Sequence, residues 1–164
     1  HAPIVDLTDE AMQDSMVWNF WHTFWTMRAA FKHMIPQQYG RVMCVSSLEG
    51  KVGKPGISIY VAAKHAINGL TKSAAHEVGT LGITVNALCP GAIETDIMKS
   101  EGPPAAKSMG MDYDGLLNMF AQESAIKKLN EVEDVAAVAT LLASDAGAGI
   151  TGSLISIDGG TAPY

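Results

Sequence analysis

The sequence has few cysteines, few basic residues and no long apolar run, and each shortage argues against a class of protein. Cys44 and Cys89, the two cysteines, lie in apolar stretches without Cys/His ligand spacing, so neither a disulfide framework nor a zinc site is expected. Lys and Arg total 11 against 17 Asp and Glu, which argues against nucleic-acid and anionic-membrane partners. No apolar run reaches the ~18 residues of a membrane span. We expect a cytoplasmic protein that handles small solutes.

The residues that are present predict a single α/β domain over residues 1–164. With 48% hydrophobic residues, a chain of 164 residues has enough apolar side chains for one core. Helical and strand patterns alternate, which predicts three parallel strands joined by crossover helices. The expected elements are a helix from Thr8 toward Met34 that ends before Pro36, strands at 41–45, 83–88 and 153–157, helices at 58–80 and 131–144, and an irregular, Met-rich stretch at 92–130.

The first expected strand has the wrong composition for the edge of a sheet. Residues 41–45 are almost continuously apolar, as in a strand that is buried on both faces of a parallel sheet. Such strands need cover on both faces and a partner on each side, and three helices supply only part of that cover. We therefore expect further sheet on the N-terminal side of this strand, outside the sequence given.

The strongest chemical signal is the segment Tyr60-Val61-Ala62-Ala63-Lys64, with Ser47 thirteen residues before the tyrosine. Helical spacing places the phenol and the ammonium on one face. Using a phenol with a pKa near ~10 as an acid or base at neutral pH requires roughly 4 kcal/mol of help to the phenolate. An ammonium about 4 Å away, at an effective dielectric constant near ~20, is worth roughly that amount. Ser47, at the end of a parallel strand, lies where open α/β sheets bind ligands.

Together with Asn19, these three residues resemble the Asn-Ser-Tyr-Lys tetrad of the short-chain dehydrogenase/reductase family. Residues 83–91 with Thr95, and residues 157–160, are similar to further family motifs in the same order. The resemblance implies a Rossmann-like, doubly wound parallel sheet, of which this sequence holds the C-terminal half. It also implies an oxidoreductase that transfers a hydride between NAD or NADP and a secondary alcohol or ketone.

The resemblance also implies a role for each member of the tetrad. Tyr60 would be the general acid/base, and Lys64 would lower its pKa and bind the nicotinamide ribose. Ser47 would orient the substrate oxygen. Asn19 would hold a water of the proton relay, in a helix that is distorted around it.

Four further residues would meet the cofactor if the resemblance holds. Pro90 and Gly91 would border the nicotinamide, the Ile93 backbone would meet the carboxamide, and Thr95 would contact the carboxamide or the pyrophosphate. The family's glycine-rich TGxxxGIG turn and its NNAG segment are missing from this sequence, a gap of about ninety residues by comparison of motif positions. The residue that selects NAD or NADP would lie in that absent half.

The substrate is expected to be a neutral secondary alcohol or ketone, with cyclic compounds and diols among the candidates. The sequence resembles 3-hydroxybutyrate dehydrogenases, which bind a carboxylate with a His two residues and a Lys ten residues after the catalytic Ser. This sequence has Glu49 and Ile57 at those positions, and Glu49 would repel an anion. An apolar lid is expected from Met98, Met109, Met111, Met119 and Phe120.

Two alternatives to a dehydrogenase remain open from the sequence. The chain could be a non-catalytic subunit of a heteromer, or an epimerase or dehydratase that uses the same Tyr/Lys pair with bound NAD. The resemblance also implies a homo-oligomer, a dimer or tetramer, assembled through helices at 18–34 and 58–80. A stripe of Trp18, Trp21 and Trp25 is expected in the core or at that interface. The histidines lack metal-ligand spacing, so no metal is expected.

Overall fold

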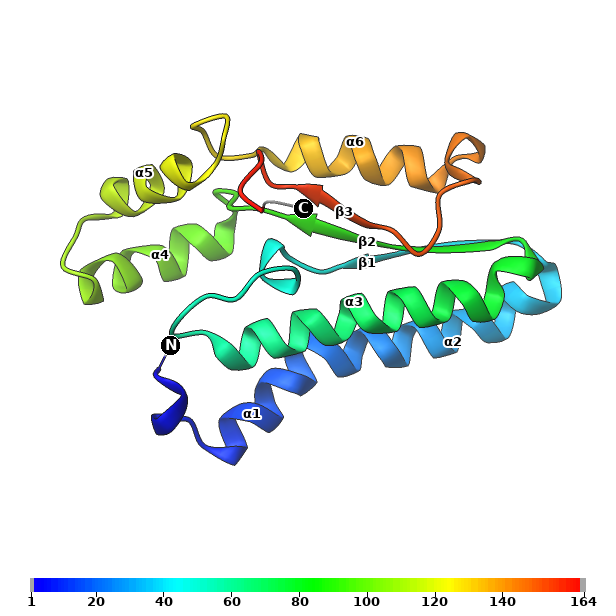
Figure 1. Ribbon diagram of the computed structural model, residues 1–164, viewed down its shortest axis with the longest axis horizontal. Coiled ribbons are helices and arrows are strands. Elements are labelled where there is room, and N and C mark those ends of the chain that lie inside the picture. The colour runs from blue at the N-terminus through cyan, green and yellow to red at the C-terminus, as the bar shows by residue number, and fades with distance from the viewer. Residues whose placement is uncertain (1, 163–164) are drawn as a thin grey trace.

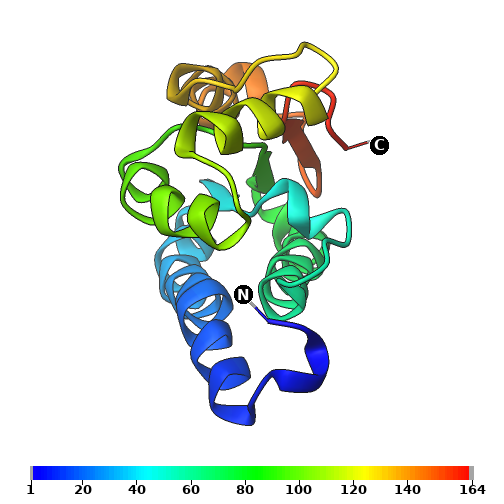
Figure 2. The same cartoon turned by 90° about the vertical axis from the view of Figure 1, so that its left-hand side faces the viewer.

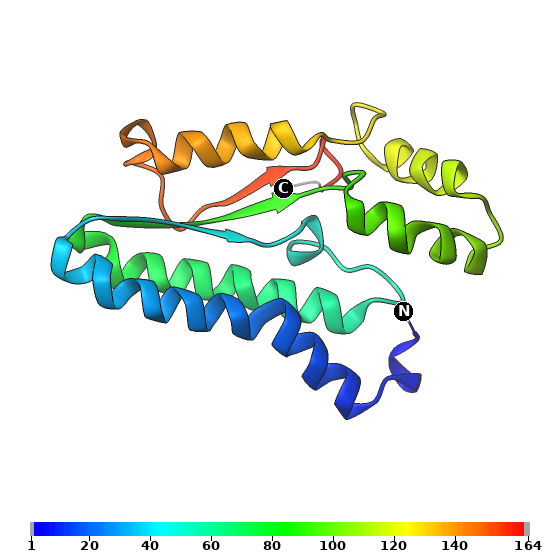
Figure 3. The ribbon, with the colours of Figure 1, turned by 180° about the vertical axis from the view of Figure 1, so that it is seen from behind.

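The computed structural model describes residues 2–162, which form a small parallel sheet with helices on both faces. Helices α2 (His22–Gln37) and α3 (Ser58–Val78) run side by side on one face, and α6 (Val132–Ala143) covers the other (Figures 1 and 3). The sheet order is β1-β2-β3, from β1 (Gly40–Val45), β2 (Ile83–Pro90) and β3 (Leu154–Ile157). This architecture confirms the expected α/β fold with parallel strands.

Strand β2 is the centre of the sheet and is almost completely buried. Both of its edges are paired: Gly40 of β1 lies opposite Ile83, and Leu154 of β3 lies opposite Ala87. Among residues 2–162, β1 pairs with β2 alone, and Val45 at its end is 59% exposed. The strand with the composition of an interior strand is thus an edge of the described sheet.

The core has one cluster on each face of the sheet. The larger cluster lies between the sheet and the α2–α3 pair, and the smaller one lies under α6. Ile67, Val85 and Cys89 in the first cluster, and Leu142 in the second, are at most 1% exposed. In the smaller cluster a larger share of the apolar residues is only partly buried, such as Met43 beneath α6.

The N-terminal helical segment consists of two α-helices joined by a π turn. Thr8 caps α1 (Asp9–Met16) by accepting from the Ala11 N–H at 3.2 Å, as its position predicts. The π turn covers Val17–Trp21, and α2 follows it directly. The expected end before Pro36 is wrong, because α2 continues to Gln37. A proline in the last turn removes only one helical hydrogen bond, and Gln38, with φ of 50°, closes the helix in the left-handed conformation.

The expectation of an irregular stretch over 92–130 is also wrong. Two helices lie there, α4 (Asp96–Ser108) and α5 (Tyr113–Glu123). Thr95 caps α4 and Asp112 caps α5, each by accepting from a backbone N–H three residues on, at 3.4 and 2.8 Å. In the sequence, Pro103 and Pro104 suggest a break, yet both prolines lie inside α4.

Both of these helices lie beyond the carboxyl ends of the strands, which are the ends that bind ligands in open α/β sheets (Figures 1 and 2). The turn Leu48–Gly50 and the start of α3 lie at the same end of the sheet. The remaining short turns are Ile4–Asp6, Gly79–Leu81 and Asp145–Gly147.

Candidate active site

Ser47 follows β1 at its carboxyl end, in a short turn that is held by its own side chain. Its hydroxyl accepts a hydrogen bond from the Glu49 N–H at 3.2 Å, and so caps the turn Leu48–Gly50. The same hydroxyl donates to the Glu49 carboxylate. Ser46, the residue before it, donates to the Lys64 carbonyl at 3.3 Å, which ties the end of β1 to α3. Ser47 and Glu49 are therefore fixed together at one edge of the site.

Tyr60 and Lys64 lie on the first turns of α3, four residues apart as the sequence predicts. The Lys64 Nζ lies 5.5 Å from the centroid of the Tyr60 ring and donates to the Val45 carbonyl at 3.3 Å. A side-chain hydrogen bond joins Tyr60 to Ser47. The structure thus brings Ser47, Tyr60 and Lys64 together from two elements.

The pKa of Tyr60 is raised above its ordinary value, which is opposite to the tuning expected from Lys64. Burial of the phenol is the largest cause of the rise. The hydrogen bond with Ser47 lowers the pKa of Tyr60, and the charge of Glu49 raises it further. Burial also lowers the pKa of Lys64, whereas the nearby Cys89 and Glu49 raise it by a smaller amount. Desolvation therefore outweighs the neighbouring charges for both groups.

Asn19 lies in the π turn Val17–Trp21, so the helix is distorted around it as the family resemblance implies. Its Nδ2 donates to the Ser15 carbonyl at 3.0 Å and to the Ser15 hydroxyl at 3.4 Å. Ser15 and Tyr60 both line a cavity of about 340 Å³, and the π turn contacts α3. Asn19 thus reaches the neighbourhood of Tyr60 through Ser15, without lining that cavity itself.

The four residues expected to contact the nicotinamide end of the cofactor lie at the carboxyl end of β2, where Pro90 is the last residue of the strand and the other three follow it. The Gly91 N–H donates to the Ile157 carbonyl at 2.9 Å, and a Cβ on Gly91 would lie 2.8 Å from the Asp158 Cα. Ile93 forms an isolated parallel bridge with Asn130, and Thr95 caps α4. With Pro90, these residues line one wall of the main cavity.

This main cavity has a volume of about 520 Å³ and includes the expected site residues from both strand ends. Ser47, Glu49 and Tyr60 line it together with Pro90, Gly91, Ile93 and Thr95. Of the expected lid, Met98 and Phe120 line this cavity, whereas Met109, Met111 and Met119 do not. Met109 and Met111 lie in the turn between α4 and α5, and Met119 lies in α5.

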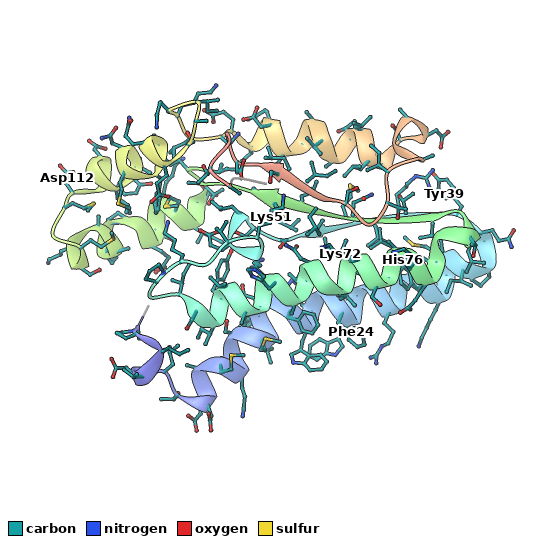
Figure 4. The ribbon with its side chains drawn as sticks, viewed as in Figure 1. Phe24, Tyr39, Lys51, Lys72, His76 and Asp112 are labelled. Atoms are coloured by element: carbon teal, nitrogen blue, oxygen red, sulfur yellow. The ribbon has the colours of Figure 1, made fainter. Side chains whose placement is uncertain are left out.

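Several lining residues escaped the sequence analysis. Lys54 pairs with Glu123 at 3.4 Å and lies over the Phe120 ring at 4.9 Å, so a loop residue and α5 line the cavity together. Nothing in the sequence links two charges 69 positions apart. Asp158 also lines the cavity, and its place directly after β3 was the available signal. Lys51, labelled in Figure 4, joins the turn after β1 to β3 by donating to the Ser156 hydroxyl at 2.8 Å.

The three expected interface tryptophans lie outside the core of this chain. Trp18 is 78% exposed, and Trp21 and Trp25 are 39% and 47% exposed. Trp21 stacks on Trp25 with ring centroids 5.9 Å apart, and Phe24, labelled in Figure 4 on the outer side of α2, meets Trp21 edge-on. The stripe therefore presents an aromatic surface that turns away from the sheet.

Residues 2–162 contain neither a cluster of metal ligands nor a membrane-spanning helix. No group of three or more His, Cys, Asp or Glu side chains there could hold a metal ion. None of the helices in that part of the chain is long and apolar enough to cross a lipid bilayer.

Comparison with known proteins gives a consistent family. The family model described as enoyl-(acyl carrier protein) reductase matches residues 1–162. D-beta-hydroxybutyrate dehydrogenase of Rhizobium meliloti is 40% identical over 143 residues, which are 87% of this chain and 55% of that protein. The crystal structure of sorbitol-6-phosphate 2-dehydrogenase from Erwinia amylovora superposes with a TM-score of 0.92 at 31% identity, over 98% of this chain and 63% of that one.

A third solved structure, ElxO with NADP bound, superposes with a TM-score of 0.87 at 30% identity, over 100% of this chain and 63% of that one. The chain thus spans a little over half the length of its curated relative and less than two thirds of these structures. The matched family model, the relatives and the fold agree with the Ser-Tyr-Lys arrangement, and the chain belongs to the short-chain dehydrogenase/reductase family.

Proposed function

We propose that this chain carries the catalytic site of an NAD(P)-dependent oxidoreductase that interconverts a secondary alcohol and a ketone. The observation that carries the proposal is that Ser47 and Tyr60 line one cavity together with Pro90, Gly91, Ile93 and Thr95. That cavity lies at the carboxyl ends of parallel strands, where ligands bind in open α/β sheets. Relatives that are dehydrogenases, and a relative with NADP bound, support the reaction class and the cofactor.

The residues after β2 fit the nicotinamide end of such a cofactor. Gly91 packs so closely on Asp158 that a side chain would not fit, so the segments after β2 and after β3 are in direct backbone contact beside the cavity. Pro90, Gly91, Ile93 and Thr95 would hold the nicotinamide, and Lys64 would meet its ribose. When bound, the cofactor supplies the hydride acceptor or donor that no side chain provides.

The chain's own residues would manage the proton. In oxidation, the Tyr60 oxygen takes the proton of the substrate hydroxyl, and in reduction it returns a proton to the carbonyl oxygen. Ser47 orients that oxygen through its hydroxyl. The ammonium of Lys64, held by the Val45 carbonyl, keeps a positive charge near the phenol, and Asn19 would hold a water behind it.

A neutral substrate fits this cavity better than an anion. Glu49 is half-buried, lines the cavity and is hydrogen-bonded to Ser47, so a substrate carboxylate placed near Ser47 would face a like charge. This applies even though a hydroxybutyrate dehydrogenase is 40% identical to the chain. Phe120 and Met98 supply an apolar wall for the rest of the substrate.

The test is the variant Tyr60→Phe in the full-length protein. It removes the proton-transferring oxygen and keeps the ring, so the kcat/KM for alcohol oxidation should fall about 10²- to 10⁴-fold. Tyr39→Phe is the matched control, since Tyr39 is 51% exposed and lies before β1, at the other end of that strand from Ser47. Near-normal turnover by a Tyr60→Phe protein with an unchanged circular dichroism spectrum would show that Tyr60 is not the general acid/base.

Three further expectations stay predictions. The homo-oligomer, a dimer or tetramer, would assemble through the helices at 18–34 and 58–80, the first of which carries the exposed tryptophans, and size-exclusion chromatography with light scattering measures it. The cytoplasmic location needs a cell-fractionation experiment. The expected additional segment of about ninety residues, judged from motif spacing, is tested by the intact mass of the purified protein.

A further inference from the structure

The Ser47 hydroxyl has almost all of its hydrogen-bonding capacity in use. A serine hydroxyl has one proton and two lone pairs. The proton goes to the Glu49 carboxylate, and one lone pair accepts from the Glu49 N–H at 3.2 Å. The other lone pair faces Tyr60, to which Ser47 is joined by a side-chain hydrogen bond. A substrate oxygen can therefore accept from Ser47 only if the serine proton turns away from Glu49.

The Glu49 carboxylate, in contrast, has capacity left over. A carboxylate offers about four lone-pair sites, of which the Ser47 hydroxyl takes one. Its position is fixed, because the turn Leu48–Gly50 is anchored to α3 by Asn68, whose Nδ2 donates to the Gly50 carbonyl at 2.7 Å. Asn68 is 4% exposed, so this anchor is buried. Glu49 thus lines the cavity with acceptor oxygens that lie within hydrogen-bonding distance of the Ser47 hydroxyl.

We propose that Glu49 selects substrates that carry a second hydroxyl on the carbon next to the reacting one. The two oxygens of a gauche vicinal diol are about as far apart as two hydrogen-bonded oxygens, which is the separation of the Ser47 hydroxyl and the Glu49 carboxylate. The reacting hydroxyl donates to Tyr60 and accepts from Ser47, and the second hydroxyl donates to Glu49 in place of Ser47. The inference rests on the proposed function and narrows its substrate to vicinal diols and α-hydroxy ketones.

The reaction balances with the nicotinamide cofactor as co-reactant. In oxidation, the carbon–hydrogen bond of the reacting carbinol breaks and the hydride, with its two electrons, reduces the oxidised nicotinamide. The hydroxyl proton of the same carbon passes to Tyr60, and the product is an α-hydroxy ketone. The second hydroxyl keeps its proton and its hydrogen bond to Glu49 throughout.

The experiment compares 2,3-butanediol with 2-butanol, which differs by the second hydroxyl alone. With the full-length protein and saturating oxidised cofactor, the kcat/KM for the diol should exceed that for 2-butanol at least about tenfold, as expected for a hydrogen bond to a charged group. Glu49→Leu should bring this ratio close to one, and Glu49→Gln, whose amide oxygen still accepts, should give an intermediate ratio. Glu77→Gln is the matched control, because Glu77 is exposed near the end of α3.

Several outcomes would overturn the inference. An equal ratio of kcat/KM values for the diol and 2-butanol in the wild type and in Glu49→Leu would show that Glu49 does not recognise the second hydroxyl. A preference for 1-amino-2-propanol over the diol would show that the carboxylate selects an ammonium group instead. If no alcohol is oxidised, the proposed function fails. In that case the affinity for 2,3-butanediol is measured by calorimetry for the wild type and for Glu49→Leu. Equal affinities would show that Glu49 does not bind the second hydroxyl. If Glu49→Leu does not fold, the isosteric Glu49→Gln carries the comparison.

Discussion

Replacing Asn68 with Ala tests how the turn after Ser47 is held against α3. Asn68 is buried, its Nδ2 donates to the Gly50 carbonyl at 2.7 Å, and its Oδ1 lies 4.0 Å from the Cys89 Sγ. The turn packs tightly there, since a Cβ on Gly50 would lie 2.7 Å from the Asn68 Nδ2 and 3.0 Å from the Lys64 carbonyl oxygen. Asn68→Ala leaves the buried Gly50 carbonyl without its donor, which costs about 1–3 kcal/mol of unfolding free energy.

Asn68→Asp should cost more than the alanine variant. Its carboxylate cannot donate to the Gly50 carbonyl, and it would place a charge in a position that is 4% exposed. Equilibrium unfolding in urea measures both differences. Asn118→Ala is the matched control, since Asn118 lies on the exposed side of α5, and its effect should stay within about 0.5 kcal/mol. An Asn68→Ala protein as stable as that control would refute the view that this bond holds the turn.

The remaining predictions concern proton transfer and close packing. Alcohol oxidation needs the deprotonated Tyr60, so its rate should rise with pH through the pKa of this phenol, which burial and then Glu49 raise. Glu49→Gln removes one raising cause, so the rising limb of the pH–rate profile should move to lower pH; no move would show that the two groups do not interact. Gly91→Ala should destabilise the fold by about 1–3 kcal/mol, because its Cβ would meet backbone atoms of the turn after β3. Thermal unfolding measures this, and an unchanged Tm would contradict the close approach.

The sequence predicts those parts of the site whose spacing is local. Tyr60 and Lys64 are one helical turn apart, so their common face follows from the period of the helix alone. The place of Ser47 follows from the end of an apolar run and the rule that ligands bind at the carboxyl ends of parallel strands. The central strand is also readable, because apolar Ile83, Val85 and Ala87 alternate with Thr84 and Asn86. Its burial on both faces is not readable, because this alternation is typical of a strand with one polar face.

The parts that the sequence does not predict depend on capping or on contacts between distant segments. Helix α4 forms in spite of Pro103 and Pro104, because a cap at Thr95 and packing against α5 outweigh their low propensity. Gly102 allows that packing, since a Cβ there would lie 2.4 Å from the Tyr113 ring. The direction of the pKa shift of Tyr60 was missed because burial is a property of the folded chain, whereas the sequence shows only the neighbouring ammonium.

One face of α3 carries both the proposed catalytic residues and the contacts that hold α3 to the end of β1. Tyr60, Lys64 and Asn68 follow at intervals of four residues, so they share a face. Lys64 binds the end of β1 through Val45, and Asn68 binds the turn that carries Ser47. The distance between the phenol and the serine hydroxyl is therefore set by how α3 docks on β1, and not by the loop alone. A variant that weakens this docking, such as Asn68→Ala, should thus lower kcat/KM as well as the unfolding free energy, although it touches no reacting atom.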